Sequence, residues 1–139
     1  MRFIPYLNFD GRCREAFAFY ERILDGKILS MLSHGDTPAG AEVPDDWQDL
    51  IINAYLVADG AEIMGADAPA AHYQPAAGTT ISIHLEDGAE ARAERIFNAF
   101  ADGGVVKMAF GPTFWAKRFG MVTDRYGTPW MINCGMVEQ

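Results

Sequence analysis

Hydrophobic residues recur with helical spacing in two segments of the chain, Cys13–Leu24 and Ala93–Phe100. The apolar positions are Cys13, Ala16, Phe17, Tyr20 and Leu24 in the first segment, and Ala93, Ile96, Phe97 and Phe100 in the second. Spacings of three and four residues place these side chains on one face of an α-helix. Each segment is therefore predicted to be an amphipathic helix with one buried face.

The ends of both helices carry start or stop signals. Asp87 and Glu90 have the spacing of a capping box at the start of the second helix. Gly26 and Gly103 stand just after the two helices, where a glycine in the left-handed conformation commonly ends a helix. We therefore expect the helices to stop at these glycines.

Segments on either side of the helices have the alternating or β-branched character of strands. Alternation is clearest before the second helix, where Ile81, Ile83 and Leu85 alternate with Ser82 and His84. The predicted strands are Phe3–Phe9, Lys27–Leu32, Leu50–Ala58, Ala61–Ala66, Thr79–Leu85, Val105–Phe110, Arg118–Asp124 and Pro129–Cys134. Each half of the chain thus reads as a strand, a helix and three further strands.

The two halves also resemble each other in sequence. "NFDGRCREAFAFYERILDGKIL" aligns without a gap on "LEDGAEARAERIFNAFADGGVV", which pairs Gly26 with Gly103. Further on, "ADGAEIMG" aligns with "RYGTPWMIN", which pairs Met64 with Met131. The predicted fold is therefore α+β, built from two tandem βαβββ modules.

Loops set the module boundaries. "SHGDTPAGAEVPDDW", within residues 33–49, is rich in Gly, Pro and Asp and is expected to be a long flexible loop between two strands. "GADAPAAHYQPAAGT" links the two modules. We therefore place the first module at about 1–67, the linker at about 68–78 and the second module at about 79–139, within a single domain.

Composition and charge exclude several classes of function. The 139 residues are 50% hydrophobic, and their formal net charge is −8. Phosphate binding needs clustered Lys and Arg, but the basic residues here are few and scattered, so no nucleic-acid partner is expected. No apolar run approaches the roughly 20 residues of a membrane span, so no membrane association is expected. Without a recognisable export signal, Cys13 and Cys134 are expected to be free thiols in a cytoplasmic protein.

Three segments carry a resemblance to a known family: "PYLNFDGRCREAFAFYERILDGK", "INAYLVADGAEIMGAD" and "TFWAKRFGMVTDRYGTPWMIN". In this order they resemble the PhnB-like branch of the vicinal oxygen chelate superfamily, which includes glyoxalases, extradiol dioxygenases and antibiotic-resistance proteins. The resemblance implies that each module curls its sheet into a half-barrel and that two half-barrels enclose a shared cavity. In many relatives the halves come from different subunits, which implies a homodimer.

The resemblance also locates the positions of the family's metal ligands, which are typically His and Glu on the first and last strands of each module. Here the first-strand positions fall at about Pro5 and Ser82, and the last-strand positions fall on Met64 and Met131. Proline and methionine are poor substitutes for imidazole and carboxylate around a divalent ion. We therefore expect neither a metal nor another cofactor. The alternative is a site rebuilt from Glu62, Asp67 and His84.

His84 is the candidate catalytic residue. It falls within a predicted strand, on the same face as Ser82, and histidine exchanges protons near neutral pH, as a general base must. The alternative is an ordinary solvent-facing histidine. His34 and His72 fall in loops and are expected at the surface.

Aromatic and methionine side chains are the candidate ligand contacts. With the family geometry, an apolar pocket is lined by Tyr6, Tyr55, Met64, Phe114, Trp115, Trp130 and Met131. Packing within or between subunits is the alternative role for Phe114 and Trp115. Asp124, Arg125 and Gly127 are expected to form the turn before the last strand.

Three functions remain open. The leading hypothesis is metal-independent binding of a planar or apolar small molecule. The alternatives are a glyoxalase-like lyase, isomerase or dioxygenase that uses a rebuilt metal site or His84, and a homodimeric scaffold without a ligand. Relatives in this branch are sometimes described as ubiquinone-pathway methyltransferases, but the sequence has no Gly-rich strand-to-helix loop of a doubly wound sheet, so methyl transfer is not expected.

Overall fold

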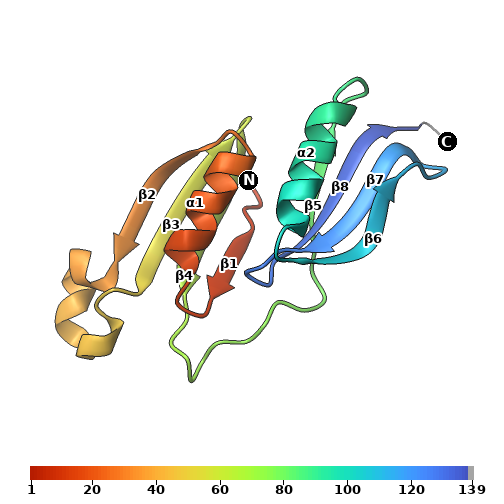
Figure 1. Ribbon diagram of the computed structural model, residues 1–139. Helices are drawn as coiled ribbons and strands as arrows, with labels where there is room; N and C mark the ends of the chain where they lie inside the picture. The colour runs from red at the N-terminus through yellow and green to blue at the C-terminus, as the bar shows by residue number, and fades with distance from the viewer. Residues whose placement is uncertain (138–139) are drawn as a thin grey trace. The chain divides into compact units, whose positions relative to one another are not determined.

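The chain folds into two βαβββ units, Met1–Pro75 and Ala76–Gln139, in the computed structural model, which describes residues 1–137 (Figure 1). Each unit has a four-stranded mixed sheet and one α-helix. The predicted α+β class with two tandem βαβββ modules is therefore confirmed. No helix within residues 1–137 is long and apolar enough to cross a membrane.

The first unit is a sheet with one helix lying across one of its faces (Figure 1). Its elements are β1 (Tyr6–Phe9), α1 (Cys13–Ile23), β2 (Lys27–Ser33), β3 (Ile51–Ala58) and β4 (Ala61–Asp67). The strand order is β1-β4-β3-β2, and only the pair β1–β4 is parallel. Phe9, Phe17 and Tyr20 are buried between α1 and the sheet, where their rings contact one another.

The second unit repeats this topology. Its elements are β5 (Ile81–Leu85), α2 (Glu90–Ala101), β6 (Val105–Gly111), β7 (Ala116–Thr123) and β8 (Pro129–Met136), in the strand order β5-β8-β7-β6. Phe100 of α2 stacks on Trp130 of β8, with ring centroids 4.4 Å apart. The helix periodicity and the strand alternation predicted these elements to within a few residues. The largest difference is at β1, which begins at Tyr6 because Phe3 is exposed before the sheet starts.

The predicted signals at the helix ends are correct in only one case. The capping box at α2 is wrong: the N-cap is Ala89 without a side-chain hydrogen bond, and Asp87 instead pairs with Lys117, with Oδ2 and Nζ 2.7 Å apart. Gly103 ends α2 with a φ of +76°, as expected. At α1 the left-handed residue is Asp25, with a φ of +52°, and not Gly26.

Gly26 has a different role, which it shares with Gly104. A Cβ atom would lie 2.9 Å from the carbonyl oxygen of Val57 at Gly26, and 2.4 Å from that of Thr123 at Gly104. Both glycines immediately precede an edge strand and allow it to approach its neighbour. The structural equivalents are therefore Gly26 and Gly104, and the gapless sequence alignment is one residue out of register because α2 has 12 residues and α1 has 11.

The segment predicted to be a long flexible loop has regular local structure. It contains three 3-10 helices, η1 (His34–Asp36), η2 (Pro38–Glu42) and η3 (Asp45–Trp47). The backbone N–H of Ser33 donates to the Asp36 carboxylate at 3.0 Å, and this bond contributes to lowering the pKa of Asp36. These local hydrogen bonds supply partners that a flexible loop would find only in water. His34 is partly buried beside the Trp47 ring and not simply at the surface, whereas His72 is exposed as expected.

Candidate functional site

Each sheet has one face packed against its own helix and a second face, which we call the helix-free face. Gly65 identifies the helix side of β4, because a Cβ atom there would lie 2.8 Å from the Phe17 ring. In the second unit Gly120 identifies the helix side of β7, where a Cβ atom would lie 2.6 Å from Phe97. Since side chains alternate along a strand, the residues next to these glycines point to the helix-free face.

Three side chains form a row across the helix-free face of the first sheet. Tyr6 of β1 pairs with Met64 of β4, and Met64 pairs with Tyr55 of β3. Tyr6 is half exposed and the other two are partly exposed. Three of the predicted ligand contacts therefore lie side by side. The residue opposite Met64 is Tyr6, one position after Pro5.

Glu62 lies on the same face, two residues before Met64. The hydroxyl of Tyr55 donates a short hydrogen bond to Glu62 Oε1, and Arg2 Nη1 donates to the same oxygen at 2.8 Å. The hydrogen bond to this carboxylate raises the pKa of Tyr55. The first sheet therefore presents an aromatic and thioether surface with one carboxylate in it.

The second sheet has an equivalent row of more polar composition. Ser82 of β5 pairs with Met131 of β8, and Met131 pairs with Met121 of β7. In the next row His84 pairs with Asn133, which in turn pairs with Phe119. Met131 is thus on the helix-free face, next to Ser82 and one row away from His84.

A chain of two hydrogen bonds holds the His84 side chain. Asn133 Nδ2 donates to Ser82 Oγ at 3.0 Å, and Ser82 Oγ lies 2.8 Å from His84 Nε2. Asn133 is buried, whereas Ser82 and His84 are exposed. Because the serine oxygen already accepts from Asn133, its own proton is well placed to be donated to His84 Nε2.

Phe114 and Trp115 lie in the connection between β6 and β7. Thr113 shapes this turn, since its Oγ1 accepts from the backbone N–H of Ala116 at 3.1 Å. Trp115 contacts Phe119 edge to face, with centroids 5.1 Å apart, whereas Phe114 is 78% exposed. Trp115 therefore adjoins the helix-free face through Phe119, and Phe114 is open to solvent.

The predicted role of Trp130 in a ligand pocket is wrong. Its side chain is fully buried on the helix side of β8, stacked on Phe100, and its Nε1 donates to Asp124 Oδ2 at 2.9 Å. Because Trp130 and Met131 are adjacent in a strand, they point to opposite faces. Strand alternation by itself therefore excludes Trp130 and Met131 from lining the same ligand pocket.

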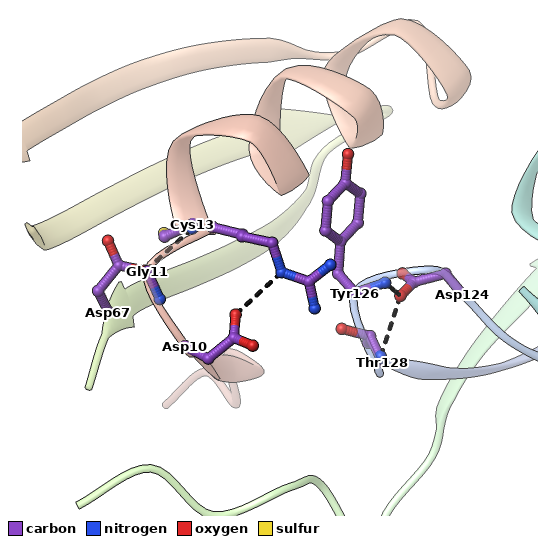
Figure 2. A network of polar contacts seen from close by, with 8 residues as sticks. Asp10, Gly11, Cys13, Asp67, Asp124, Tyr126 and Thr128 are labelled. Atoms are coloured by element: carbon purple, nitrogen blue, oxygen red, sulfur yellow. Dashed lines mark hydrogen bonds and ion pairs between the residues drawn. The ribbon is translucent and has the colours of Figure 1, made fainter. Parts of the chain in front are cut away.

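Asp67 and Asp124 are buried carboxylates with structural roles, shown in Figure 2. Asp67 Oδ1 accepts from the backbone N–H groups of Gly11 and Cys13 at 3.1 and 2.9 Å. Asp124 Oδ1 accepts from the N–H groups of Tyr126 and Thr128, as expected for the turn before β8. Asp67 is thus bonded to backbone N–H groups, and Asp124 to backbone N–H groups and to the Trp130 indole.

Asp67 therefore cannot belong to the alternative metal site that combines it with Glu62 and His84. Asp67 lies on the helix side of β4 and Glu62 on the opposite face, so the two carboxylates cannot bind one ion. Within residues 1–137 no three His, Cys, Asp or Glu side chains are grouped so that they could hold a metal. The resemblance places the family's ligand positions at about Pro5 and Ser82 and on Met64 and Met131, a donor set that does not fit a divalent ion.

Neither cysteine has the environment of a nucleophile. Burial, followed by the nearby Asp67 charge, raises the pKa of the Cys13 thiol to about 12. Burial also raises the pKa of Cys134, and its thiol donates to the carbonyl of Glu86 at 3.3 Å. A protonated, buried thiol is unreactive.

Comparison with known proteins assigns the family. The sequence model of the family described as 3-demethylubiquinone-9 3-methyltransferase matches residues 1–133. The chain is also 35% identical over 140 residues to Protein YjdN of Escherichia coli strain K12, covering 93% of this chain and 92% of that protein. The chain belongs to this family, and its sequence features resemble the PhnB-like branch of the vicinal oxygen chelate superfamily.

Solved structures share the fold of this chain. Protein PA1353 from Pseudomonas aeruginosa is 46% identical, with a TM-score of 0.87 over 97% of this chain and 98% of that chain. A fosfomycin resistance protein from Listeria monocytogenes, FosX, is 14% identical with a TM-score of 0.65, covering 98% of this chain and 93% of that chain. The FosX structure contains Mn(II), but at this identity the likeness to the PhnB-like chain concerns the fold alone.

Sequence reasoning missed several residues of the helix-free faces. Met121, Phe119 and Asn133 join the second face through the pairing of β7 with β8, and Arg2 joins the first through its contact with Glu62. The alternation in β8 indicated Asn133, because it stands two residues after Met131. No sequence signal indicated Arg2, which lies 60 residues away from Glu62.

Proposed function

We propose that this PhnB-like protein binds a planar or apolar small molecule on the helix-free faces of its sheets, without the metal of its metal-dependent relatives. The observation that carries the proposal is the row of Tyr6, Met64 and Tyr55, with its counterpart at Met131 and Met121. Two of these side chains, Met64 and Met131, stand at positions where the family resemblance places metal ligands. Methionine adapts its shape to varied apolar ligands, and aromatic rings provide flat contact surfaces.

We do not extend methyl transfer, the activity in the family's description, to this chain. A nucleotide-like methyl donor favours a Gly-rich loop between a strand and a helix in a doubly wound parallel sheet. Each sheet here has a single parallel pair, β1–β4 or β5–β8. S-adenosylmethionine is therefore a useful negative probe in the binding experiment.

The experiment titrates the protein with menadione, a neutral planar quinone, and follows the quenching of tryptophan fluorescence. Met64→Lys and Met131→Lys each place a charge on a helix-free face, and each is expected to weaken binding at least tenfold if its face contacts the ligand. Glu94→Lys, on the exposed side of α2, is the matched control and should bind as the wild type does. No binding of S-adenosylmethionine is expected. Equal affinities for all variants, or no menadione binding at millimolar concentration, would contradict the proposal.

A second candidate function is proton transfer by His84, which the hydrogen bonds from Asn133 through Ser82 favour. The assay follows isomerisation of the hemithioacetal of methylglyoxal and glutathione by chelator-treated protein. A general base contributes about 10²–10⁴-fold, so His84→Ala should lower kcat by at least about 100-fold. Ser82→Ala should lower it less, because Ser82 only orients the ring, and His72→Ala should have no effect. Absence of turnover in the wild type, or unchanged turnover in His84→Ala, rejects this candidate.

The homodimer remains a prediction, supported by apolar side chains on one edge strand of each sheet. Leu29 and Leu32 are exposed on β2, and Val105, Val106 and Met108 are exposed on β6. An exposed apolar edge favours pairing with a second chain. Light scattering at micromolar concentration should therefore give twice the mass of one chain. Val106→Glu should produce monomers while Lys107→Glu on the same strand should not, and a monomeric wild type would disprove the prediction.

A further inference from the structure

The carboxylate of Glu62 has a cationic partner that comes from outside the sheet. Arg2 belongs to the segment before β1, which has no helix or strand, and its side chain is 71% exposed. The Glu62 side chain is only 13% exposed. A largely buried carboxylate needs a counter-charge, because desolvation of an unpaired charge is costly. Here the counter-charge is the Arg2 guanidinium, whose side chain is itself largely exposed to solvent.

Glu62 also has unused hydrogen-bonding capacity. Arg2 Nη1 and the Tyr55 hydroxyl both donate to Oε1, and no other hydrogen bond from residues 1–137 reaches this carboxylate. A carboxylate with both oxygens available accepts paired N–H groups from a planar cation. Oε2 is therefore the natural acceptor for a second N–H group.

The surroundings of Glu62 suit the body of such a cation. Tyr6, Met64 and Tyr55 lie in one row on the same face, at directly paired positions of three adjacent strands. Aromatic rings attract organic cations through their negative faces, and the contact is strengthened where water is displaced. The Tyr55 hydroxyl, which like any tyrosine is protonated at neutral pH, donates to Oε1 and holds this carboxylate oxygen in place.

We infer that the helix-free face of the first sheet binds a flat organic cation, an amidinium, guanidinium or protonated amine on an aromatic or apolar body, with Glu62 as its counter-ion. The inference rests on the proposed function for the use of this face and adds the charge of the ligand. Arg2 occupies the place of the ligand's cationic group, and its guanidinium leaves when the ligand binds.

Benzamidinium and its neutral analogue benzamide form a matched pair of probes. Isothermal titration of the wild-type protein is expected to show benzamidinium binding that weakens with salt. Arg2→Ala removes the competing guanidinium and should tighten benzamidinium binding by up to about fivefold, the upper end of the range for one exposed ion pair. Arg22→Ala removes the same charge from α1 and should change little. Glu62→Gln should weaken benzamidinium binding at least tenfold and leave benzamide unaffected.

Two outcomes overturn the inference. Equal benzamidinium affinity in the wild type, Arg2→Ala and Glu62→Gln would show that Glu62 is not the counter-ion, and weaker binding in Arg2→Ala would show that Arg2 does not compete. If Glu62→Gln fails to fold, the comparison of Arg2→Ala with Arg22→Ala still decides. Menadione titration of the same samples separates the two proposals: binding of menadione without benzamidinium rejects only the cation site, and binding of benzamidinium alone rejects the neutral ligand class.

Discussion

Asp67→Ala should lower the free energy of unfolding by about 3–5 kcal/mol, measured by urea denaturation followed by circular dichroism. The buried Asp67 carboxylate accepts three backbone hydrogen bonds, two of them at the start of α1 and the third from Ile51 at the start of β3, at 2.9 Å. Each buried N–H left without a partner costs about 1–3 kcal/mol. The substitution therefore weakens the connection between β4, α1 and β3 at one point.

The control for this prediction is Asp10→Ala. Asp10 is exposed and pairs with Arg12 at 3.0 Å, so its removal should change stability by no more than about 1 kcal/mol. Asp67→Asn retains one oxygen acceptor and should give an intermediate loss. The proposed role of Asp67 is wrong if Asp67→Ala and Asp10→Ala unfold at the same urea concentration.

Gly104→Ala should lower the free energy of unfolding by about 2–3 kcal/mol, the upper part of the range for overpacking, because the atoms in contact cannot easily move. The new Cβ atom would lie 2.4 Å from the carbonyl oxygen of Thr123 and 2.6 Å from that of Phe100. Both obstacles are backbone atoms, so β6 must move away from β7 or α2 must shift. Thermal unfolding followed by circular dichroism measures the loss.

Gly111→Ala, at the other end of β6, is the matched control. No atom lies within 4 Å of the position of its Cβ, and its φ is not in the left-handed region. Its stability should stay within about 0.5 kcal/mol of the wild type, as for most surface substitutions. Equal melting temperatures for Gly104→Ala and Gly111→Ala would show that the edge strand accommodates a methyl group at both ends.

The parts of the fold that could be predicted from the sequence are those encoded by local periodicity. The apolar face of α1 and the alternation of β5 follow from residues close together in sequence, and the structure places both elements as predicted. The family resemblance was also readable, because three long segments carry it in order. The turn at Asp124 belongs to the same category, since its carboxylate binds N–H groups only two and four residues away.

Contacts between distant segments account for what was missed. Gly26 was expected to end a helix, but its lack of a side chain instead allows β2 to approach Val57 of β3 closely. Asp67 is an alternative metal ligand by sequence, but its carboxylate accepts hydrogen bonds from the backbone N–H groups of Gly11 and Cys13. In neither case does the neighbouring sequence indicate the partner.

Helical and strand periodicities are local properties of the chain, so the order of strands and helices and the tandem repeat can be predicted from the sequence. Which chemistry each face presents depends on contacts between distant segments. Strand register moved Trp130 into the helix-packed core and left Met131 beside Ser82 and Met121. It also brought Arg2 to Glu62, and such a pairing depends on where β1 meets β4, which no local pattern encodes.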